Sequence, residues 1–442
     1  NDLCAITHEL TSAVDADRVQ ALGVSGLGPA FLPLDAHDRP LRPAILYGID
    51  TRASAEIDEL SGRLGAERVL ERCGAMLTSQ SVGPKALWVR RHEPEVWART
   101  ERFAMVASYL VLRLTGEYVL DNVSASLCEP LHDIETLEWV PGWADEVVDG
   151  LQLPELRWAT RPAGVLRAAA AAETGLPAGI PVAVGTVDAW AEATSVGVRR
   201  PGEAMLMYGT ALTLVHMLAP FSPLASMWGC VGALPGTWSL AGGVTTSGAL
   251  TKWLSRLVGD VPYETLLAEA AAIGPGADGL LLLPYFSGER NPFYDPDARG
   301  VIAGLRLDHD RGHLYRAILE GTALGARHML ETMAEAGHRP TRLVAVGGGT
   351  RHPLWPQVVS DVTGLAQELP VETIGASYGD AWLGGVAAGL LGPTADWSSI
   401  GATVEPDPST REPYDELYGL FLEAYPATAS VMHALARRVA SD

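Results

Sequence analysis

The chain has 442 residues, a formal net charge of −21, and cysteines only at Cys4, Cys73, Cys128 and Cys230. This length predicts two domains of roughly 200 residues each, and the acidic surplus argues against nucleic acid or an anionic membrane surface as a partner. No apolar run reaches the roughly 18 residues of a membrane span. Because the cysteines form no CxxC pair and no secretory signal opens the sequence, we expect reduced thiols and a cytoplasmic location.

The first part of the chain predicts short strands among helices. Its segments are an opening helix with apolar positions Leu3, Ile6, Leu10 and Val14, a strand over 18–26, two strands over 30–47 around a turn at 35–39, a mostly helical stretch over 53–115, and an irregular region over 130–165. Sheet and helix therefore alternate here.

Asp188 follows an apolar run in the stretch IPVAVGTVDAWAEAT, 180–194. The run is rich in β-branched residues, as a buried parallel strand would be, and 189–193 favours a helix. Asp188 could cap that helix by accepting a backbone N–H two or three residues on. It could equally face a substrate, because ligands of open α/β sheets bind at the carboxyl ends of the strands.

The second part of the chain restarts an alternating α/β pattern after RRPG, so we place the domain boundary near Val198–Gly202 and expect domains over 1–198 and 199–442. The expected elements are a strand-turn-strand over 203–218, a strand over 237–243, a helix over 247–257, a strand from 279, a polar loop over 287–300, a strand over 301–305, a helix over 313–335, a strand over 342–349, and helices from 354 and over 380–392.

Two glycine-containing turns could bind a nucleotide. In YGTAL, Gly209 lets backbone N–H groups approach an anion, and the Thr210 hydroxyl adds a donor. In VAVGGGTRHPLW, Gly347–Gly349 ends a strand just before a helix, where a flat adenine could lie on the backbone. Either segment could also be an ordinary turn.

Two polar segments have less certain chemistry. SGERNPFYDPDARG, 287–300, favours an ordered loop with local Glu289–Arg290 and Asp297–Arg299 pairs. YGIDTR, 47–52, carries Asp50 and Arg52, which could bind hydroxyls or cap the next helix. The histidines have no HxH or HExxH spacing, and no GxSxG elbow is present.

A spaced pattern gives the most specific resemblance. It reads Gly300-x-Ile302-x-Gly304-Leu305, seven residues, then His313-Leu314-x-x-Ala317-Ile318-Leu319-Glu320. Together with LPYFSGERNPFYDPDARG before it and GPKALWVRRHEPEVW at 83–97, it resembles the FGGY carbohydrate kinases, and the xylulokinases in particular. The matching segments run from residue 19 to about 390.

The resemblance implies an α/β fold of two RNase H-like domains of the actin/Hsp70/sugar kinase (ASKHA) type, with a cleft between them. ATP with Mg²⁺ would bind the second domain and a sugar or polyol the first. It implies Asp188 as the catalytic base. The implied nucleotide contacts are Gly209, Thr210, Gly248, Lys252, Gly347, Gly348 and Gly349, and the candidate substrate contacts are Leu27, Gly28, Asp50, Arg52 and Asp188. The metal ligands stay unassigned, and a homodimer is compatible with the sequence.

Two departures from the family pattern keep an alternative open. Xylulokinases usually carry Gln-Met-His-Gly where this chain has Leu27, Gly28 and Pro29, so a pentulose such as xylulose is only the first candidate. The family's Asp-x-Gly-Thr hairpin would precede Asn1, and we expect it to be missing from the sequence given. The alternative is a catalytically inactive nucleotide-binding regulator. A Rossmann dehydrogenase is disfavoured because GxGxxG is lacking.

Overall fold

The computed structural model describes residues 2–47 and 50–439. Its contacts divide the chain into two compact units, each assembled from separate stretches. Unit 1 comprises Asn1–Pro201, Met217–Leu240 and Ile374–Trp397. Unit 2 comprises Gly202–His216, Ala241–Thr373 and Ser398–Asp442. Among the described residues, no helix has the length and apolar character needed to cross a bilayer.

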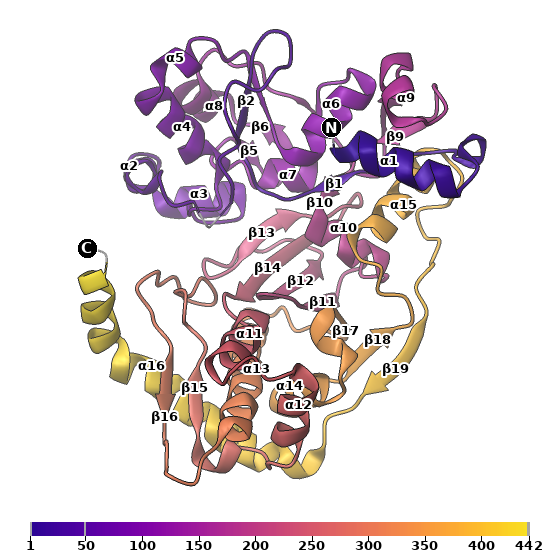
Figure 1. Ribbon diagram of the computed structural model, residues 1–442. Coiled ribbons are helices and arrows are strands. Elements are labelled where there is room, and N and C mark those ends of the chain that lie inside the picture. The colour runs from indigo at the N-terminus through magenta and orange to yellow at the C-terminus, as the bar shows by residue number, and fades with distance from the viewer. Residues whose placement is uncertain (1, 48–49, 440–442) are drawn as a thin grey trace. The chain divides into compact units, whose positions relative to one another are not determined.

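Unit 1 is a mixture of helices and very short strands (Figure 1). Its helices are α1 (Asp2–Ala13), α2 (Ser54–Leu64), α3 (Ala66–Cys73), α4 (Val82–His92), α5 (Pro94–Trp97), α6 (Val106–Thr115), α7 (Asn122–Ser126), α8 (Pro141–Val148), α9 (Ala168–Thr174), α10 (Asp188–Ser195) and α15 (Ala376–Ala387). Its strands are β1 (Ser25–Gly26), β2 (Leu32–Leu34), β3 (Arg102–Ala104), β4 (Val119–Asp121), β5 (His132–Asp133), β6 (Glu138–Trp139), β7 (Glu155–Arg157), β8 (Pro162–Val165), β9 (Pro181–Ala183), β10 (Thr186–Val187) and β13 (Trp228–Val231).

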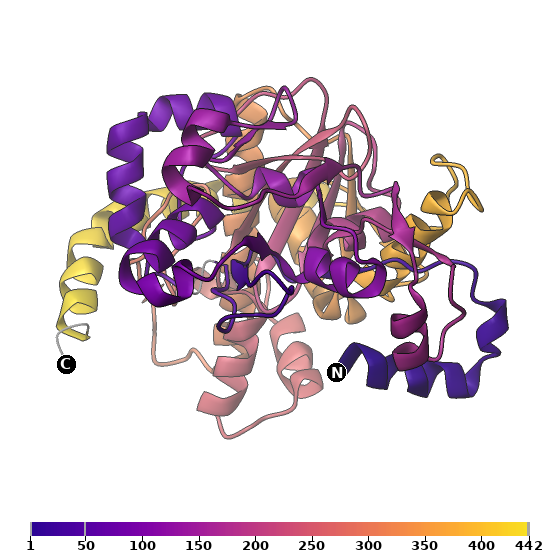
Figure 2. The ribbon, with the colours of Figure 1, turned by 90° about the horizontal axis from the view of Figure 1, so that it is seen from above.

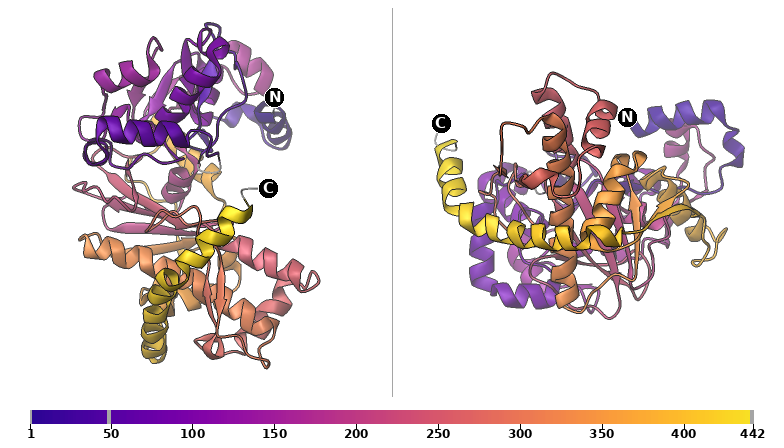
Figure 3. Two further views of the ribbon diagram at one scale, coloured as in Figure 1. Left: turned by 90° about the vertical axis from the view of Figure 1, so that its left-hand side faces the viewer. Right: turned by 90° about the horizontal axis from the view of Figure 1, so that it is seen from below.

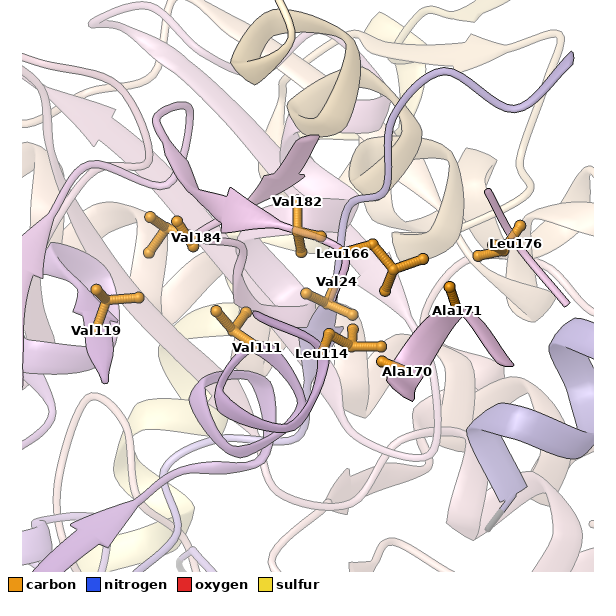
Figure 4. Packing of buried hydrophobic residues seen from close by; sticks show 11 residues of the cluster. Val24, Val111, Leu114, Val119, Leu166, Ala170, Ala171, Leu176, Val182 and Val184 are labelled. Carbon is orange, nitrogen blue, oxygen red and sulfur yellow. The ribbon is translucent and has the colours of Figure 1, made fainter. Parts of the chain in front are cut away.

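An apolar cluster of unit 1 lies where β9 meets α6 and α9 (Figure 4). Val182 comes from β9, while Val111 and Leu114 are three apart on α6 and therefore share one face of that helix. The opening helix α1 packs beside α9 (Figure 2). Leu3 of α1 contacts the cluster, whereas its later apolar residue Leu10 is exposed.

The segment 30–47 departs from the two strands predicted there. Only β2 is a strand, and its partner is β3, in an antiparallel pair from Leu32↔Ala104 to Leu34↔Arg102. The expected turn is present, since Asp35 Oδ1 accepts the N–H of His37 and Arg39. After it the chain makes only isolated bridges, because its prolines lack the N–H that a ladder needs.

Unit 2 reproduces the predicted alternation of strands and helices. Its strands are β11 (Glu203–Tyr208), β12 (Leu212–Leu218), β14 (Trp238–Val244), β15 (Leu281–Leu283), β16 (Val301–Ala303), β17 (Arg342–Val346), β18 (Gln367–Pro370) and β19 (Ile400–Val404), of which β12 and β14 also extend into the unit 1 stretch 217–240. Its helices are α11 (Gly248–Leu257), α12 (Tyr263–Ala271), α13 (Arg311–Glu335), α14 (Leu354–Thr363) and α16 (Arg411–Val439). Short 3₁₀ turns cover Ala16–Arg18 in unit 1 and Ala277–Gly279, Gly348–Arg351 and Pro408–Thr410 in unit 2.

The strands of the main sheet that belong to unit 2 follow the order β14-β12-β11-β17-β18-β19. β11 pairs antiparallel with β12 and parallel with β17, which places the Gly209–Ala211 turn and the residues after Val346 at the same edge. Helix α13 packs against β15, and a Cβ on Gly321 would lie 2.4 Å from the Leu282 carbonyl oxygen. Glycine in a helix interior costs about 1 kcal/mol, and here it permits this close approach.

The long C-terminal helix α16 packs against β15 and α14 (Figure 3). A buried polar network joins it to α13. Arg316 Nε donates to Glu320 Oε1 at 2.7 Å, Arg316 Nη2 donates to the Tyr414 hydroxyl at 2.8 Å, and that hydroxyl donates to Glu320 Oε1 at 2.9 Å. The last residue of the spaced family pattern, Glu320, is therefore the acceptor that ties α16 to α13.

We expect Glu320→Ala to lower the free energy of unfolding by about 3 kcal/mol, because it leaves the buried Arg316 guanidinium without its carboxylate. The measurement is urea unfolding followed by circular dichroism. The matched control is Glu331→Ala on the same helix, whose carboxylate is 44% exposed and pairs with Arg327, and which should cost below about 1 kcal/mol. Equal losses in the two variants would contradict a special role for the buried network.

Candidate active-site residues

Asp188 begins α10, directly after β10. β10 runs parallel to β1, with Ser25 opposite Thr186 and Gly26 opposite Val187. Asp188 and the Leu27–Gly28 segment therefore follow the carboxyl ends of two paired parallel strands. A Cβ on Gly28 would lie 2.8 Å from a methyl carbon of Val187, so the two segments are in close contact. The structure thus brings three of the predicted substrate-binding residues to one edge of unit 1.

The capping interpretation of Asp188 is wrong in the form predicted. The N-cap position of α10 is Val187, which makes no side-chain cap. Asp188 Oδ1 instead accepts the N–H of its own neighbour Ala189 at 2.8 Å. The side chain is half-buried, and burial raises the pKa of its carboxyl, opposed by the hydrogen bond from Ala189. The carboxylate keeps capacity to accept a proton or hydroxyl.

Two further carboxylates lie near Asp188 and were missed from the sequence. Glu192 follows one turn later on α10, and Asp380 comes from α15, which packs on α10. Burial and the nearby charge of Asp188 raise the pKa of Glu192. The same two causes raise the pKa of Asp380 to about 6. The Ser25 hydroxyl, which donates to Asp380 Oδ2 at 2.8 Å, opposes this rise. The charge of Asp188 is thus one cause of the raised pKa of both other carboxyls.

Asp50 and Arg52 form a local ion pair. Arg52 Nε lies 2.8 Å from Asp50 Oδ1, and this hydrogen bond lowers the pKa of Asp50 despite partial burial. The guanidinium also stacks over Trp88 of α4, 4.9 Å from the ring centre. Ala53 occupies the N-cap position of helix α2 without a side-chain cap, so Asp50 does not cap this helix. Residues 48 and 49 of the YGIDTR motif lie outside the described residues.

The predicted nucleotide residues converge within unit 2. The N–H of Gly248 donates to the Gly209 carbonyl at 3.0 Å, and the N–H of Ser247 donates to the Thr210 carbonyl at 3.0 Å. The glycines permit this contact, since a Cβ on Gly248 would lie 2.5 Å from the Gly209 oxygen. Thr210 is exposed, and so is Lys252, one turn along α11 from Gly248.

Gly347–Gly349 lies on the other side of the same turn. Gly347 has φ +94° and its added Cβ would lie 2.7 Å from the Tyr208 carbonyl oxygen, so both conformation and space require glycine. Nothing lies within 4 Å of an added Cβ on Gly348, which leaves open space over that backbone. Trp355 packs against Tyr208 in a T-shaped arrangement, with ring centres 5.5 Å apart.

The loop 287–300 is self-bonded through backbone groups as well as side chains. Backbone bonds join Glu289 and Asp295 in both directions at 2.9 Å. The Glu289 carboxylate binds Thr245, and Arg299 donates to the carbonyls of Pro296 and Ala298. The Glu289 carboxylate also accepts the N–H of Arg290 at 2.8 Å, and the charge of Arg290 lowers the pKa of Glu289, so both the neighbouring arginine and the distant Thr245 interact with it.

Comparisons with known proteins agree with this architecture. The models of the FGGY carbohydrate kinase family match over residues 3–195 for the N-terminal domain and 204–388 for the C-terminal domain. The chain is 32% identical to the xylulose kinase of Escherichia coli strain K12 over 380 residues, which are 84% of this chain and 76% of that protein. It is 31% identical to the ribulokinase of Mycolicibacterium smegmatis over 415 residues, 88% of this chain and 73% of that protein.

Solved structures agree as well. The crystal structure of xylulose kinase from Rhodospirillum rubrum superposes with a TM-score of 0.88 at 33% identity, covering 98% of this chain and 89% of that one. The predicted α/β fold of two RNase H-like, ASKHA-type domains is thereby confirmed. The chain belongs to the FGGY family of carbohydrate kinases, phosphotransferases that act on a hydroxyl group with ATP as the phosphate donor.

Proposed function

We propose that this chain phosphorylates a hydroxyl of a pentulose, with ATP and Mg²⁺, and that Asp188 is the general base. The observation that carries the proposal is the place of Asp188 at the carboxyl end of β10, with a carboxylate that does not cap its helix. The choice of a pentulose is supported by relatives named as xylulose kinase and ribulokinase. No observation favours the inactive regulator.

The chemistry requires little covalent participation by the protein. The sugar oxygen attacks the γ-phosphorus of ATP, the bond from that phosphorus to the β,γ-bridging oxygen breaks, and ADP leaves. The hydroxyl proton passes to the Asp188 carboxylate. Aligning the two reactants supplies much of the rate enhancement, because it replaces a bimolecular encounter.

The residues of unit 2 fit a phosphate-bearing ligand. Gly209 and Thr210 would offer a close backbone and an exposed hydroxyl, and the exposed Lys252 would add positive charge. The open space over Gly348 would accept the flat adenine. The buried Ser247 hydroxyl has no hydrogen-bond partner within 2–47 and 50–439, and a reorganised turn with a phosphate oxygen nearby would satisfy it.

Mg²⁺ is proposed as a companion of the nucleotide. Among the described residues, no group of three or more His, Cys, Asp or Glu side chains is arranged to hold a metal ion. Mg²⁺ commonly binds through substrate phosphates and waters with only one or two carboxylates, so such a cage is not needed. When bound, the ion would neutralise charge developing on the phosphates.

A coupled ADP-release assay tests the proposal. The acceptor panel contains pentuloses, aldopentoses, polyols including glycerol, and sugar acids, each with ATP and Mg²⁺. We expect turnover with a pentulose, lost in Asp188→Asn. Turnover only with glycerol or a sugar acid would overturn the substrate class, and ATP binding without turnover on any acceptor would overturn the kinase assignment. The cytoplasmic location and the homodimer remain predictions.

The pH dependence of kcat/KM should follow the ionisation of the Asp188 carboxyl. Acid protonates the carboxylate, which then cannot accept the hydroxyl proton, so kcat/KM should rise with pH through the pKa of Asp188 and then level off. Because burial raises this pKa, the rise should lie above the value of about 3.9 for an exposed aspartate. The measurement is a profile of kcat/KM with the best acceptor. A rate that stays flat down to about pH 4 would contradict the prediction.

A further inference from the structure

The buried carboxyl of Glu289 has no part in the function proposed so far. It lies in the loop between β15 and β16, and only 1% of the residue is exposed. Burial raises its pKa to about 7, opposed by hydrogen bonds from Thr245 and Arg290. Burying a carboxyl is costly unless donors satisfy it. The donors that satisfy this carboxyl therefore indicate what it holds in place.

One oxygen of Glu289 receives several donors. Oε1 accepts the hydroxyl of Thr245 at 2.7 Å, the N–H of Thr245 at 3.1 Å and the N–H of Arg290 at 2.8 Å. Oε2 lies 3.4 Å from the N–H of Thr245. Glu289 therefore holds both the backbone and the side chain of Thr245, the residue that directly follows β14.

Other residues of the same loop hold the end of β14 and the bend that follows it. Asn291 Oδ1 accepts the N–H of Gly243 at 3.2 Å. The Thr246 hydroxyl donates to the Pro284 carbonyl. The end of β14 and the first residues of the bend after it, 243–246, are thus bound by the loop after β15.

The residues that follow, 247–249, carry the hydrogen bonds to Gly209 and Thr210. The N–H groups of Ser247 and Ala249 both donate to the Thr210 carbonyl, at 3.0 and 3.1 Å, and the N–H of Gly248 donates to Gly209. A continuous set of contacts therefore runs from Glu289 through Thr245 and the 246–248 backbone to the Gly209–Thr210 turn.

We propose that Glu289 is a positioning residue that fixes the Thr245–Gly248 turn and, through it, the conformation of the Gly209–Thr210 turn. The consequence is that Gly209 and Thr210 are held in the conformation that binds the phosphates of ATP, and this consequence rests on the proposed function. Preorganised donors cost no rearrangement at the moment of reaction, so a loosened turn would bind nucleotide less tightly.

The chemistry of the contacts distinguishes two variants. Glu289→Ala leaves the hydroxyl and N–H of the half-buried Thr245 and the N–H of Arg290 without this acceptor, which destabilises the conformation that they hold. Glu289→Gln keeps an acceptor oxygen in the Oε1 position. Glutamine should therefore preserve the conformation of the turn. If the negative charge of Glu289 were needed for nucleotide binding, Glu289→Gln would weaken binding as Glu289→Ala does.

The experiment measures amide hydrogen exchange in the nucleotide-free protein and the dissociation constant of a non-hydrolysable ATP analogue. In Glu289→Ala we expect exchange over 209–211 and 245–249 to increase and the dissociation constant to rise about tenfold. Glu289→Gln should stay within about threefold of the parent protein. Thr245→Ala, which removes only the hydroxyl donor, gives a milder version of the same change if Glu289→Ala does not fold.

Asp295→Asn is the matched control, in the same loop. Asp295 Oδ2 lies 2.7 Å from His433 Nε2 of α16, so this substitution tests an attachment of the loop to α16 and not to Thr245. We expect lower thermal stability with unchanged exchange over 209–211. Unchanged exchange there in a folded Glu289→Ala, or an equal increase in Asp295→Asn, would overturn the inference. If the parent protein binds no ATP analogue, the proposed function fails, and exchange alone decides the role of Glu289.

Discussion

Asp188→Asn is expected to lower kcat by about 100- to 10,000-fold, because the amide keeps the size of the side chain but cannot take up the hydroxyl proton. The dissociation constant of ATP should stay unchanged, since the nucleotide residues proposed here belong to unit 2 and Asp188 to unit 1. The measurements are steady-state ADP release with saturating acceptor and equilibrium binding of an ATP analogue.

Glu192→Gln is the control for this change. It lies one turn later on the same helix, is also half-buried, and has a pKa raised by burial and by the charge of Asp188. The substitution removes a neighbouring carboxylate without touching the proposed base, so kcat should change by less than about threefold. A near-normal kcat in Asp188→Asn, or an equal loss in the two variants, would remove Asp188 from its assigned role.

Gly248→Ala is expected to raise the KM for ATP by about 10- to 100-fold, since a displacement of about 1 Å at a positioned group can cost that much. The added Cβ would lie 2.5 Å from the Gly209 carbonyl oxygen, so α11 and the Gly209–Thr210 turn must separate. Initial rates over a range of ATP concentrations give the KM, and circular dichroism checks the fold.

Gly274→Ala provides the comparison in unit 2. Nothing lies within 4 Å of its added Cβ, so the substitution meets no obstacle and the KM for ATP should be that of the parent protein. An unchanged KM in a folded Gly248→Ala would show that the contact between Gly248 and Gly209 does not shape the nucleotide site. A similar rise in both variants would indicate a general loss of stability.

Local sequence predicted most elements of unit 2. The helix expected over 247–257 is α11, the strand-turn-strand over 203–218 is β11 and β12, and the helix expected over 313–335 is α13. These segments have strong periodicity or long apolar runs, and glycines mark their ends. The prediction failed over 40–47, where apolar residues suggested a strand but prolines interrupt the ladder.

The candidate site was only partly accessible from sequence. Asp188, Gly209 and Gly347 stand at strand ends, and that position alone marked them as candidates. The sequence could not pair Ser25 with Asp380, because 355 positions separate them and only the packing of α15 on α10 unites them. It also could not show that Glu289 accepts hydrogen bonds from Thr245, 44 positions earlier, as well as from its neighbour Arg290.

The sequence by itself determined the alternation of strands and helices, the strand-end position of Asp188 and the family pattern ending at Glu320, since each depends on neighbouring residues and backbone preferences. Only the tertiary structure decided which buried polar groups meet. A carboxyl such as Glu289 must find donors once it leaves water, and the donors distant in sequence, such as those of Thr245, are set by which segments the packed core brings alongside it.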